Sequence, residues 1–301
     1  MEKPYILHMF TPEKNLSPFD VNMALDAGWS AVVPYLGIEL GEVTALVQDA
    51  IFSRSPSGVK RTGIFIGGRD VKMAIDILRT ARKSMVPEFG FEVSALADPS
   101  GSFTTAAAMV AMVEQELKQS FQTDLAGKNI LALGGTGPVG QIAAVLAAKA
   151  GAKVKVVGRQ LEKAQRVAEL CNQEYGEGKT GIEGQADANK AELIKTADVV
   201  FATAAAGIEV LSAELVAAGP QLKVAADVNA VPPPGIAGLE AHHKGTPIVG
   251  SKSGAVGIGA LAIGAIKYQA QHRLLLRMRE GKPVYYDYND AFAVAREAVL
   301  G

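Results

Sequence analysis

A glycine-rich turn between a predicted strand and a predicted helix constrains the fold of this chain more than any other segment. The strand covers 129–133, the turn is Gly135-Thr136-Gly137-Pro138-Val139-Gly140, and the helix covers 139–150. Glycines at the spacing G-x-G-x-x-G allow a tight turn and a close approach of the backbone to a pyrophosphate, which the free N–H groups of the helix N-terminus then bind. These six residues predict a dinucleotide site. An ordinary glycine turn without a ligand is the alternative.

The segments after this turn continue the alternation of strand and helix. Strands are predicted at 153–157, 198–202 and 223–227, and a helix at 161–172 follows the first of them. Short apolar strands that alternate with helices form parallel sheets. We therefore expect a doubly wound (Rossmann) domain over 121–260.

The first hundred residues also alternate between strand-like and helix-like runs. The strand-like runs are 5–10, 31–35, 62–67 and 92–96, and the helix-like runs are 18–27, 43–48 and 70–83. This pattern predicts a separate α/β domain over 1–120, which ends in a long alanine-rich helix from Thr104. The run 254–280 is predicted as one long helix. With a short helix in the tail, the segment 261–301 is expected to join the two domains and to return to the first.

Composition argues against several kinds of partner. The chain of 301 residues carries 30 basic and 31 acidic side chains spread along its length, so it offers no basic face to nucleic acid. One cysteine, Cys171, and four histidines at unsuitable spacings predict no metal site. The longest uncharged stretch near the C-terminus, 253–266, is too short to span a bilayer. We expect a cytoplasmic protein with no nucleic-acid, membrane or metal partner.

The end of the second strand bears on which dinucleotide binds. NAD-specific domains place an acidic residue there to bind the ribose hydroxyls. This chain instead has Val157-Gly158-Arg159, with Lys163 early in the next helix. A guanidinium and an ammonium suit a ribose phosphate, so NADP is favoured and NAD is the second choice. Two surface charges without a ligand are the alternative.

Further cofactor candidates follow two later strands, because open α/β sheets bind ligands at the carboxyl ends of their strands. Asp227 and Asn229 end one strand, and Ala204 follows the strand before it. We expect all three beside the cofactor. Asp227 could equally organise the turn into the proline loop that follows.

Substrate candidates follow the fourth strand of the first domain. They are Asp98, Gly101, Ser102 and Thr104, in a segment dense in turn-forming residues. An Asx turn at Asp98, and helix capping by Ser102 and Thr104, are at least as good an explanation of these residues as substrate binding.

Two charged residues have a structural and a functional interpretation. Ser17-Pro18-Phe19-Asp20 has the spacing of a capping box, which by itself explains Asp20. Lys267 ends the uncharged run 254–266, and spacing alone favours a side chain that reaches from the edge of a core into solvent. An active-site cation in a crevice is the alternative for Lys267.

Taken together, five segments of the chain resemble NAD(P)-dependent methylenetetrahydromethanopterin dehydrogenases of methylotrophic bacteria. They are 17–23, 63–68, 98–105, 227–233 and 257–264, and the resemblance extends over nearly the whole chain. It implies two domains similar to those of methylenetetrahydrofolate dehydrogenase, with the pterin in the cleft between them. It also implies oxidation of methylenetetrahydromethanopterin to the methenyl form. The family has an NADP-specific branch and a branch that accepts both cofactors; the terminal segments of this chain resemble the dual branch, whereas Arg159 and Lys163 resemble the NADP branch. A homo-oligomer is expected.

The same resemblance implies roles for individual residues. The family's functional aspartate falls on Asp20 and its active-site lysine on Lys267, which favours the functional interpretation of both. Hydride transfer from the methylene carbon leaves a cation, so negative charge and alignment assist it. Asp20 and Asp98 would orient the substrate or stabilise that charge. The remaining alternatives are a methylenetetrahydrofolate dehydrogenase, here without the Y-x-x-x-K motif of cyclohydrolases, and a non-catalytic NADP sensor.

Overall fold

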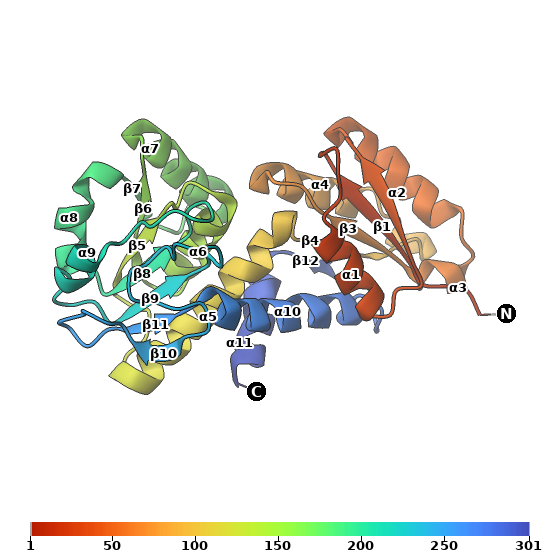
Figure 1. Ribbon diagram of the computed structural model, residues 1–301. Helices are drawn as coiled ribbons and strands as arrows, with labels where there is room; N and C mark the ends of the chain where they lie inside the picture. Colours follow the sequence, from red (N-terminus) through yellow and green to blue (C-terminus); the bar gives the residue numbers. More distant parts are fainter. Residues whose placement is uncertain (1, 301) are drawn as a thin grey trace. The chain divides into compact units, whose positions relative to one another are not determined.

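The protein is described by a computed structural model over residues 2–300, and it divides into two compact units (Figure 1). Unit 1 comprises Met1–Thr104 and Tyr268–Val294, and unit 2 comprises Thr105–Lys267 and Ala295–Gly301. The divisions fall inside three helices, α5 (Ser102–Phe121), α10 (Ala260–Arg277) and α11 (Tyr288–Leu300). They differ from the boundaries expected near 120 and 260. A helix that passes from one unit to the next keeps its local pattern, so the sequence does not mark where its contacts change.

Unit 1 is built on a sheet of five parallel strands, in the order β12-β4-β3-β1-β2. The strands are β1 (Ile6–Thr11), β2 (Ala31–Leu36), β3 (Thr62–Ile66), β4 (Ser94–Ala97) and β12 (Tyr285–Tyr286). Counted from β2, the order 2-1-3-4-5 is one of the doubly wound orders and reverses between β1 and β3. The short strand β12 was not expected from the sequence.

The helices of unit 1 follow the predicted alternation. They are α1 (Pro18–Asp26), α2 (Val43–Phe52), α3 (Pro56–Val59) and α4 (Val71–Lys83), with short 3₁₀ turns η1 (Leu40–Glu42), η2 (Pro87–Phe89) and η3 (Pro99–Gly101). Asp70 is the N-cap of α4, and its carboxylate accepts a hydrogen bond from the Met73 N–H at 2.7 Å. The helix has Arg82 and Lys83 in its last turn. Both ends therefore suit the helix dipole. β3 and β4 are buried along their whole length, as expected for parallel strands covered on both faces.

Unit 2 contains a sheet of seven strands in the order β10-β11-β9-β8-β5-β6-β7. The strands are β5 (Asn129–Leu133), β6 (Lys153–Gly158), β7 (Glu183–Ala186), β8 (Val199–Ala202), β9 (Val224–Asp227), β10 (Lys244–Pro247) and β11 (Val256–Ile258). All neighbours are parallel except β10 and β11. From β7 to β11 the order is 3-2-1-4-5-6, which is the order of a Rossmann domain. The doubly wound fold expected from the sequence is confirmed.

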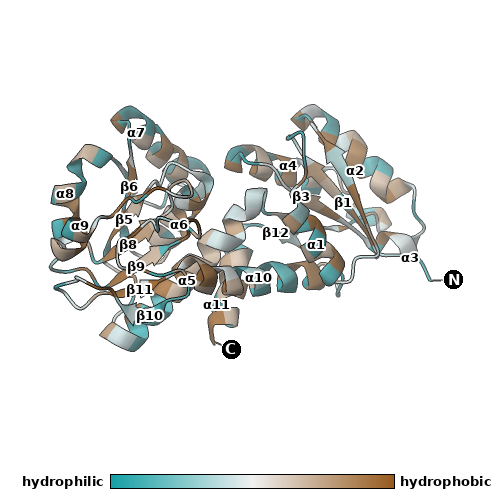
Figure 2. Cartoon of the chain, in the orientation of Figure 1, coloured by the Kyte–Doolittle hydropathy of each residue, from teal (hydrophilic) through white to brown (hydrophobic). Residues whose placement is uncertain are grey.

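Helices cover this second sheet, and apolar residues lie between the two layers. The helices are α6 (Pro138–Lys149), α7 (Leu161–Leu170), α8 (Lys190–Leu193) and α9 (Ala213–Ala217), with the short helical turns η4 (Cys171–Tyr175, a π-helix), η5 (Asp187–Asn189) and η6 (Ile194–Thr196). The core includes Leu131, Val200 and Ala225 on adjacent strands. Figure 2 shows apolar strands inside and polar residues on the outer helices α7 and α8.

The single helix expected over 254–280 is wrong in its first part. Val256–Ile258 forms strand β11, and helix α10 begins at Ala260. A β-carbon on Gly257 would lie 2.9 Å from Leu239 Cδ1, and one on Gly259 would lie 2.1 Å from the Glu240 carbonyl oxygen. Glycine at these positions allows the backbone of β11, and of the residue that follows it, to pack closely against its neighbours. The spacing of apolar residues does not reveal such close backbone packing.

The C-terminal segment returns to unit 1, as expected. Trp29 Nε1 donates to the Leu275 carbonyl of α10 at 3.3 Å, and β12 pairs with β4. The last residues belong to unit 2, where the Arg296 guanidinium binds both carboxylate oxygens of Glu114 on α5 at 2.7 and 2.9 Å. Within the part of the chain that is described, no helix combines the length and apolar character needed to cross a membrane.

Candidate functional site

The glycine turn connects β5 to α6, and glycine is required at its positions for different geometric reasons. A β-carbon on Gly135 would lie 2.5 Å from the Ala132 carbonyl oxygen, and one on Gly140 would lie 2.5 Å from Gly135 Cα. At these two positions the fold itself leaves no room for a side chain. Gly137, the N-cap of α6, is different, because the nearest atom to an added β-carbon is the Gly134 carbonyl oxygen at 3.6 Å. The open position therefore lies at the helix N-terminus, where a pyrophosphate would approach.

Gly134 was missed by the sequence interpretation, although it directly precedes the motif. Its φ is +71°, and a β-carbon there would lie 2.6 Å from Ala204 Cα. Ala204 thus packs against the glycine turn, next to the expected cofactor residues. The two consecutive glycines at 134 and 135 are the feature of the sequence that indicates this tight turn. Pro138 occupies the first turn of α6, where its missing N–H costs nothing, and Val139 follows it half-buried.

A pocket of about 320 Å³ opens beside this turn. It is lined by Thr136, Arg159, Gln160 and Lys163. Gly158 permits its shape, because a β-carbon there would lie 2.8 Å from Thr136 Cγ2. Among the described residues, neither Arg159 nor Lys163 has a hydrogen-bond or ion-pair partner, and both are exposed. Two cations are therefore available to an anion at the end of β6.

Asp227 and Asn229 fold the loop after β9. Asp227 accepts hydrogen bonds from the Asn229 N–H at 2.9 Å and the Gly235 N–H at 2.6 Å, which agrees with its turn interpretation. Burial raises the pKa of Asp227, and the backbone donors oppose that rise. Asn229 accepts from the Gly207 N–H at 3.1 Å and donates to the Pro233 carbonyl at 2.8 Å. Both line a pocket of about 220 Å³.

In unit 1, a pocket of about 600 Å³ lies at the carboxyl ends of β1, β3 and β4. It therefore occupies the β1/β3 switch point, where doubly wound sheets bind ligands. Its lining comes from three loops and the start of α1: Glu13, Lys14, Asn15, Leu16, Ser17, Pro18, Asp20, Gly68, Arg69 and Ser100. Asp20 is the expected functional residue among them.

Asp20 does not belong to a capping box. Ser17 makes no side-chain capping bond, and α1 starts on the backbone hydrogen bond from the Asp20 N–H to the Ser17 carbonyl at 3.1 Å. The Asp20 carboxylate, on a residue only 3% exposed, accepts a hydrogen bond from Gln271 Nε2 at 2.8 Å. Tertiary structure thus overrides the capping role that spacing alone favours. Gln271 was not a candidate from the sequence.

The four expected substrate residues meet around the start of α5. Asp98 is fully buried and accepts from the Phe103 and Thr104 N–H groups at 2.9 and 3.1 Å and from Thr104 Oγ1 at 2.6 Å. Asp98 therefore caps the start of α5, and the Thr104 hydroxyl donates to Asp98 rather than capping the helix itself. Gly101 has a φ of +64° within the turn. Ser102, which is 1% exposed, has a buried hydroxyl without a hydrogen-bond partner among the described residues.

Ser100 is a pocket residue that the sequence interpretation missed. It has a φ of 52°, an uncommon value for a residue other than glycine, and its hydroxyl donates to the Gly68 carbonyl at 2.7 Å. The bond ties the loop after β4 to the loop after β3, and both residues line the unit 1 pocket. The turn-forming run Pro99-Ser100-Gly101 indicated a loop but not this contact.

Lys267 lies in α10 and is only 9% exposed. It does not extend into solvent as the edge-of-core interpretation requires. Burial of an ammonium group is costly, and buried ionisable groups are frequent at functional sites. Lys267 precedes Gln271 by four residues, so the two lie one turn apart on the same face of α10.

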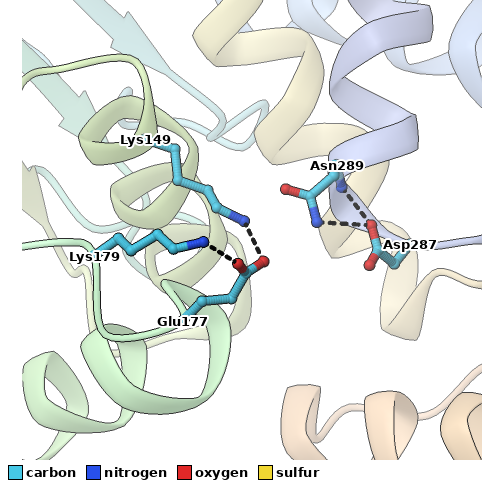
Figure 3. A network of polar contacts seen from close by, with 5 residues as sticks. All are labelled: Lys149, Glu177, Lys179, Asp287 and Asn289. Carbon is cyan, nitrogen blue, oxygen red and sulfur yellow. Dashed lines mark hydrogen bonds and ion pairs between the residues drawn. The ribbon is translucent and has the colours of Figure 1, made fainter.

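Other charged clusters lie outside these pockets. Lys179 and Lys149 bind Glu177 at 2.9 and 3.4 Å and lower its pKa, and the Asp287 carboxylate accepts from the Asn289 backbone N–H at 2.7 Å (Figure 3). Exposed pairs of this kind stabilise a fold weakly.

One group of possible metal ligands occurs among the described residues. Atoms of Glu240, His242 and His243 lie within 4.8 Å of one another. The Glu240 N–H donates to His243 Nδ1 at 3.2 Å, and the Glu240 carboxylate lies 3.4 Å from His242 Nε2.

Known families match both units. The family described as methylene-tetrahydromethanopterin dehydrogenase, N-terminal, matches residues 18–100, and the shikimate/quinate 5-dehydrogenase family matches residues 115–234. Among solved structures, quinate dehydrogenase from Corynebacterium glutamicum in complex with NAD has a TM-score of 0.51 at 15% identity, covering 99% of each chain. That similarity supports the fold alone.

Sequence relatives extend over nearly the full length. The NAD(P)-dependent methylenetetrahydromethanopterin dehydrogenase of Methylorubrum extorquens is 45% identical, over 97% of this chain and 98% of its own. The bifunctional protein MdtA of the same organism is 33% identical over 97% and 98%. This chain therefore belongs to the family of NAD(P)-dependent methylenetetrahydromethanopterin dehydrogenases.

Proposed function

We propose that the protein oxidises methylenetetrahydromethanopterin to methenyltetrahydromethanopterin, with NADP as the preferred acceptor and NAD as a second one. The observation that carries the proposal is the full-length similarity to the relative named for this activity. The methylene carbon loses a hydride, which is a proton with two electrons, and the pterin product becomes a cation. When bound, the dinucleotide accepts that hydride.

The residues of unit 2 fit a dinucleotide phosphate. The open N-cap at Gly137 and the free N–H groups of α6 suit the pyrophosphate. Arg159 and Lys163, with Thr136 beside them, suit the phosphate on the adenosine ribose. Both cations lack partners in the described chain, which is the basis for preferring NADP over NAD.

The residues of unit 1 fit a reaction that creates positive charge. Asp20 supplies a buried carboxylate in the lining of the 600 Å³ pocket. Fixed charge in a site with little water stabilises developing opposite charge more strongly than it does in solvent. Asp20 therefore stabilises the forming methenyl cation. Lys267 of unit 2, the lysine expected from the family resemblance, is proposed separately as a catalytic residue. No proton is removed from the methylene carbon, so the site needs no general base there.

The buried hydroxyl of Ser102 adds a polar group at the end of β4. A buried hydroxyl without a partner costs free energy, so this position is not explained by packing alone. Asp98 acts through the turn that it caps, by fixing the start of α5 next to Ser102 and Thr104.

The test is an assay of purified protein with methylenetetrahydromethanopterin and methylenetetrahydrofolate, each with NADP and with NAD, following the methenyl product by absorbance. We expect turnover with the methanopterin substrate and a higher kcat/KM with NADP. Turnover only with the folate would assign the protein to the folate reaction, and dinucleotide binding without turnover would identify a sensor.

Two variants test the site within that assay. Asp20→Asn removes the charge, and we expect kcat to fall about 100-fold. The control Asp26→Asn changes an exposed aspartate at the end of the same helix and leaves kcat unaltered.

The cytoplasmic location and the homo-oligomeric state expected from the sequence are also part of this proposal. The mass of the native protein in solution tests the oligomeric state.

A further inference from the structure

Gln271 is a fully buried amide in a helix whose other buried side chains are mostly apolar. It is 0% exposed, and its Nε2 donates to Asp20 Oδ1 at 2.8 Å. Burial of an amide costs free energy unless the amide is hydrogen-bonded, so an apolar residue would serve simple packing better. The amide at this position is explained by the carboxylate that it contacts.

The contact is one of three attachments made by α10 and the turn that follows it. Leu275, four residues after Gln271, accepts from Trp29 Nε1 at 3.3 Å. Arg279, in the turn just after α10, donates to the Ala27 carbonyl. These bonds hold α10 against α1 and the turn that follows it, so the position of Gln271 relative to Asp20 is fixed from two further points. Lys267, four residues before Gln271, lies on the same face.

A glutamine also differs from the cations that usually bind buried carboxylates. Its amide donates a hydrogen bond and restricts the rotation of the carboxylate, but it adds no positive charge of its own. Gln271 therefore orients the Asp20 carboxylate without adding a positive charge of its own.

We propose that Gln271 is a positioning residue for hydride transfer, holding the Asp20 carboxylate in the orientation in which it stabilises the cation formed in the unit 1 pocket. This inference rests on the proposed function. Gln271 acts through Asp20 and does not itself touch the substrate.

The first experiment replaces the amide by an apolar group of nearly equal length. For Gln271→Met we expect kcat to fall about tenfold, with KM within about twofold of the wild type, because the carboxylate acts in the transition state. Gln269→Met is the matched control, since this exposed glutamine lies two residues away on the same helix. A lower unfolding temperature with an unchanged kcat would assign Gln271 a purely structural role and overturn the inference.

A double-mutant cycle tests whether Gln271 acts through Asp20. Combining Gln271→Met with Asp20→Asn should lower kcat no further than Asp20→Asn alone. Effects that multiply instead would contradict the inference.

The exchange of Asp20→Asn with Gln271→Glu retains a hydrogen bond and moves the charge to α10, which covers the case in which Gln271→Met does not fold. We expect this variant to fold with the kcat of Asp20→Asn, and recovery of wild-type kcat would overturn the inference. A wild-type protein without turnover refutes the proposed function itself, whereas an active wild type with an equally active Gln271→Met refutes only the role of Gln271.

Discussion

Thr104 Oγ1 donates a hydrogen bond of 2.6 Å to Asp98 Oδ2, at the point where β4 gives way to α5. The other oxygen of Asp98 accepts from two N–H groups at the start of the helix. One fully buried carboxylate thus satisfies three donors. The loop between β4 and α5, which carries Ser100, and the first residue of α5, Ser102, depend on this carboxylate.

We therefore expect Asp98→Ala to lower the free energy of unfolding by about 3 kcal/mol, because it removes a cap and leaves buried donors without a partner. Urea unfolding followed by circular dichroism measures the change. The control Asp124→Ala removes a carboxylate that accepts from the Ala126 N–H in an exposed turn, and it should cost about 0.5 kcal/mol. Equal losses in the two variants would refute the capping role.

Substitution in the glycine turn should separate folding from cofactor binding. Gly137→Ala has room in the fold, so we expect normal thermal stability but dinucleotide affinity weakened by about tenfold or more, since the methyl group lies where the pyrophosphate approaches. Gly140→Ala would bring its β-carbon against Gly135 and should destabilise the fold by about 1–3 kcal/mol. Calorimetric titration with NADP and thermal unfolding measure the two effects, and tight NADP binding by Gly137→Ala would contradict this division.

The two cations at the end of β6 should decide between NADP and NAD. For the double variant Arg159→Ala and Lys163→Ala we expect KM for NADP to rise about 10- to 100-fold, the equivalent of one or two charge-assisted hydrogen bonds. KM for NAD should change little. Arg166→Ala, an exposed arginine on α7, is the control. An equal rise for both cofactors would show that these cations do not recognise the ribose phosphate.

Acid should weaken the fold partly through His8 in β1. Burial, and secondly the nearby Arg54 charge, hold the pKa of His8 below its usual value of 6.5. The folded protein therefore binds this proton less readily than the unfolded chain does, so stability present above pH 6.5 is lost as the pH falls from there through the folded pKa.

His8→Asn should accordingly lose less thermal stability than the wild type between about pH 7.5 and about pH 5. In the wild type, His8 Nδ1 lies 3.0 Å from the Tyr35 hydroxyl. Because the variant loses this contact, we also expect a general loss of stability at both pH values. His242→Asn, at a side chain that is 74% exposed, should follow the wild-type pH dependence. Parallel curves for His8→Asn and the wild type would exclude His8 as the cause.

Local patterns in the sequence determined much of this protein. The glycine turn, the strand and helix that flank it and the alternation in both units are encoded within a few residues each, because turn geometry and side-chain periodicity are local properties. The positions of Arg159 and Lys163 at the end of β6 follow directly from that alternation.

Tertiary structure alone decided the remaining features. The bond between Asp20 and Gln271 joins residues 251 positions apart, strand β11 lies inside an apolar run that matches a helix equally well, and β12 contains only two residues. Spacing at Asp20 even favoured a capping box that is not formed. Contacts of this kind depend on which surfaces meet after the chain has folded, and residues so far apart leave no periodic trace in the sequence.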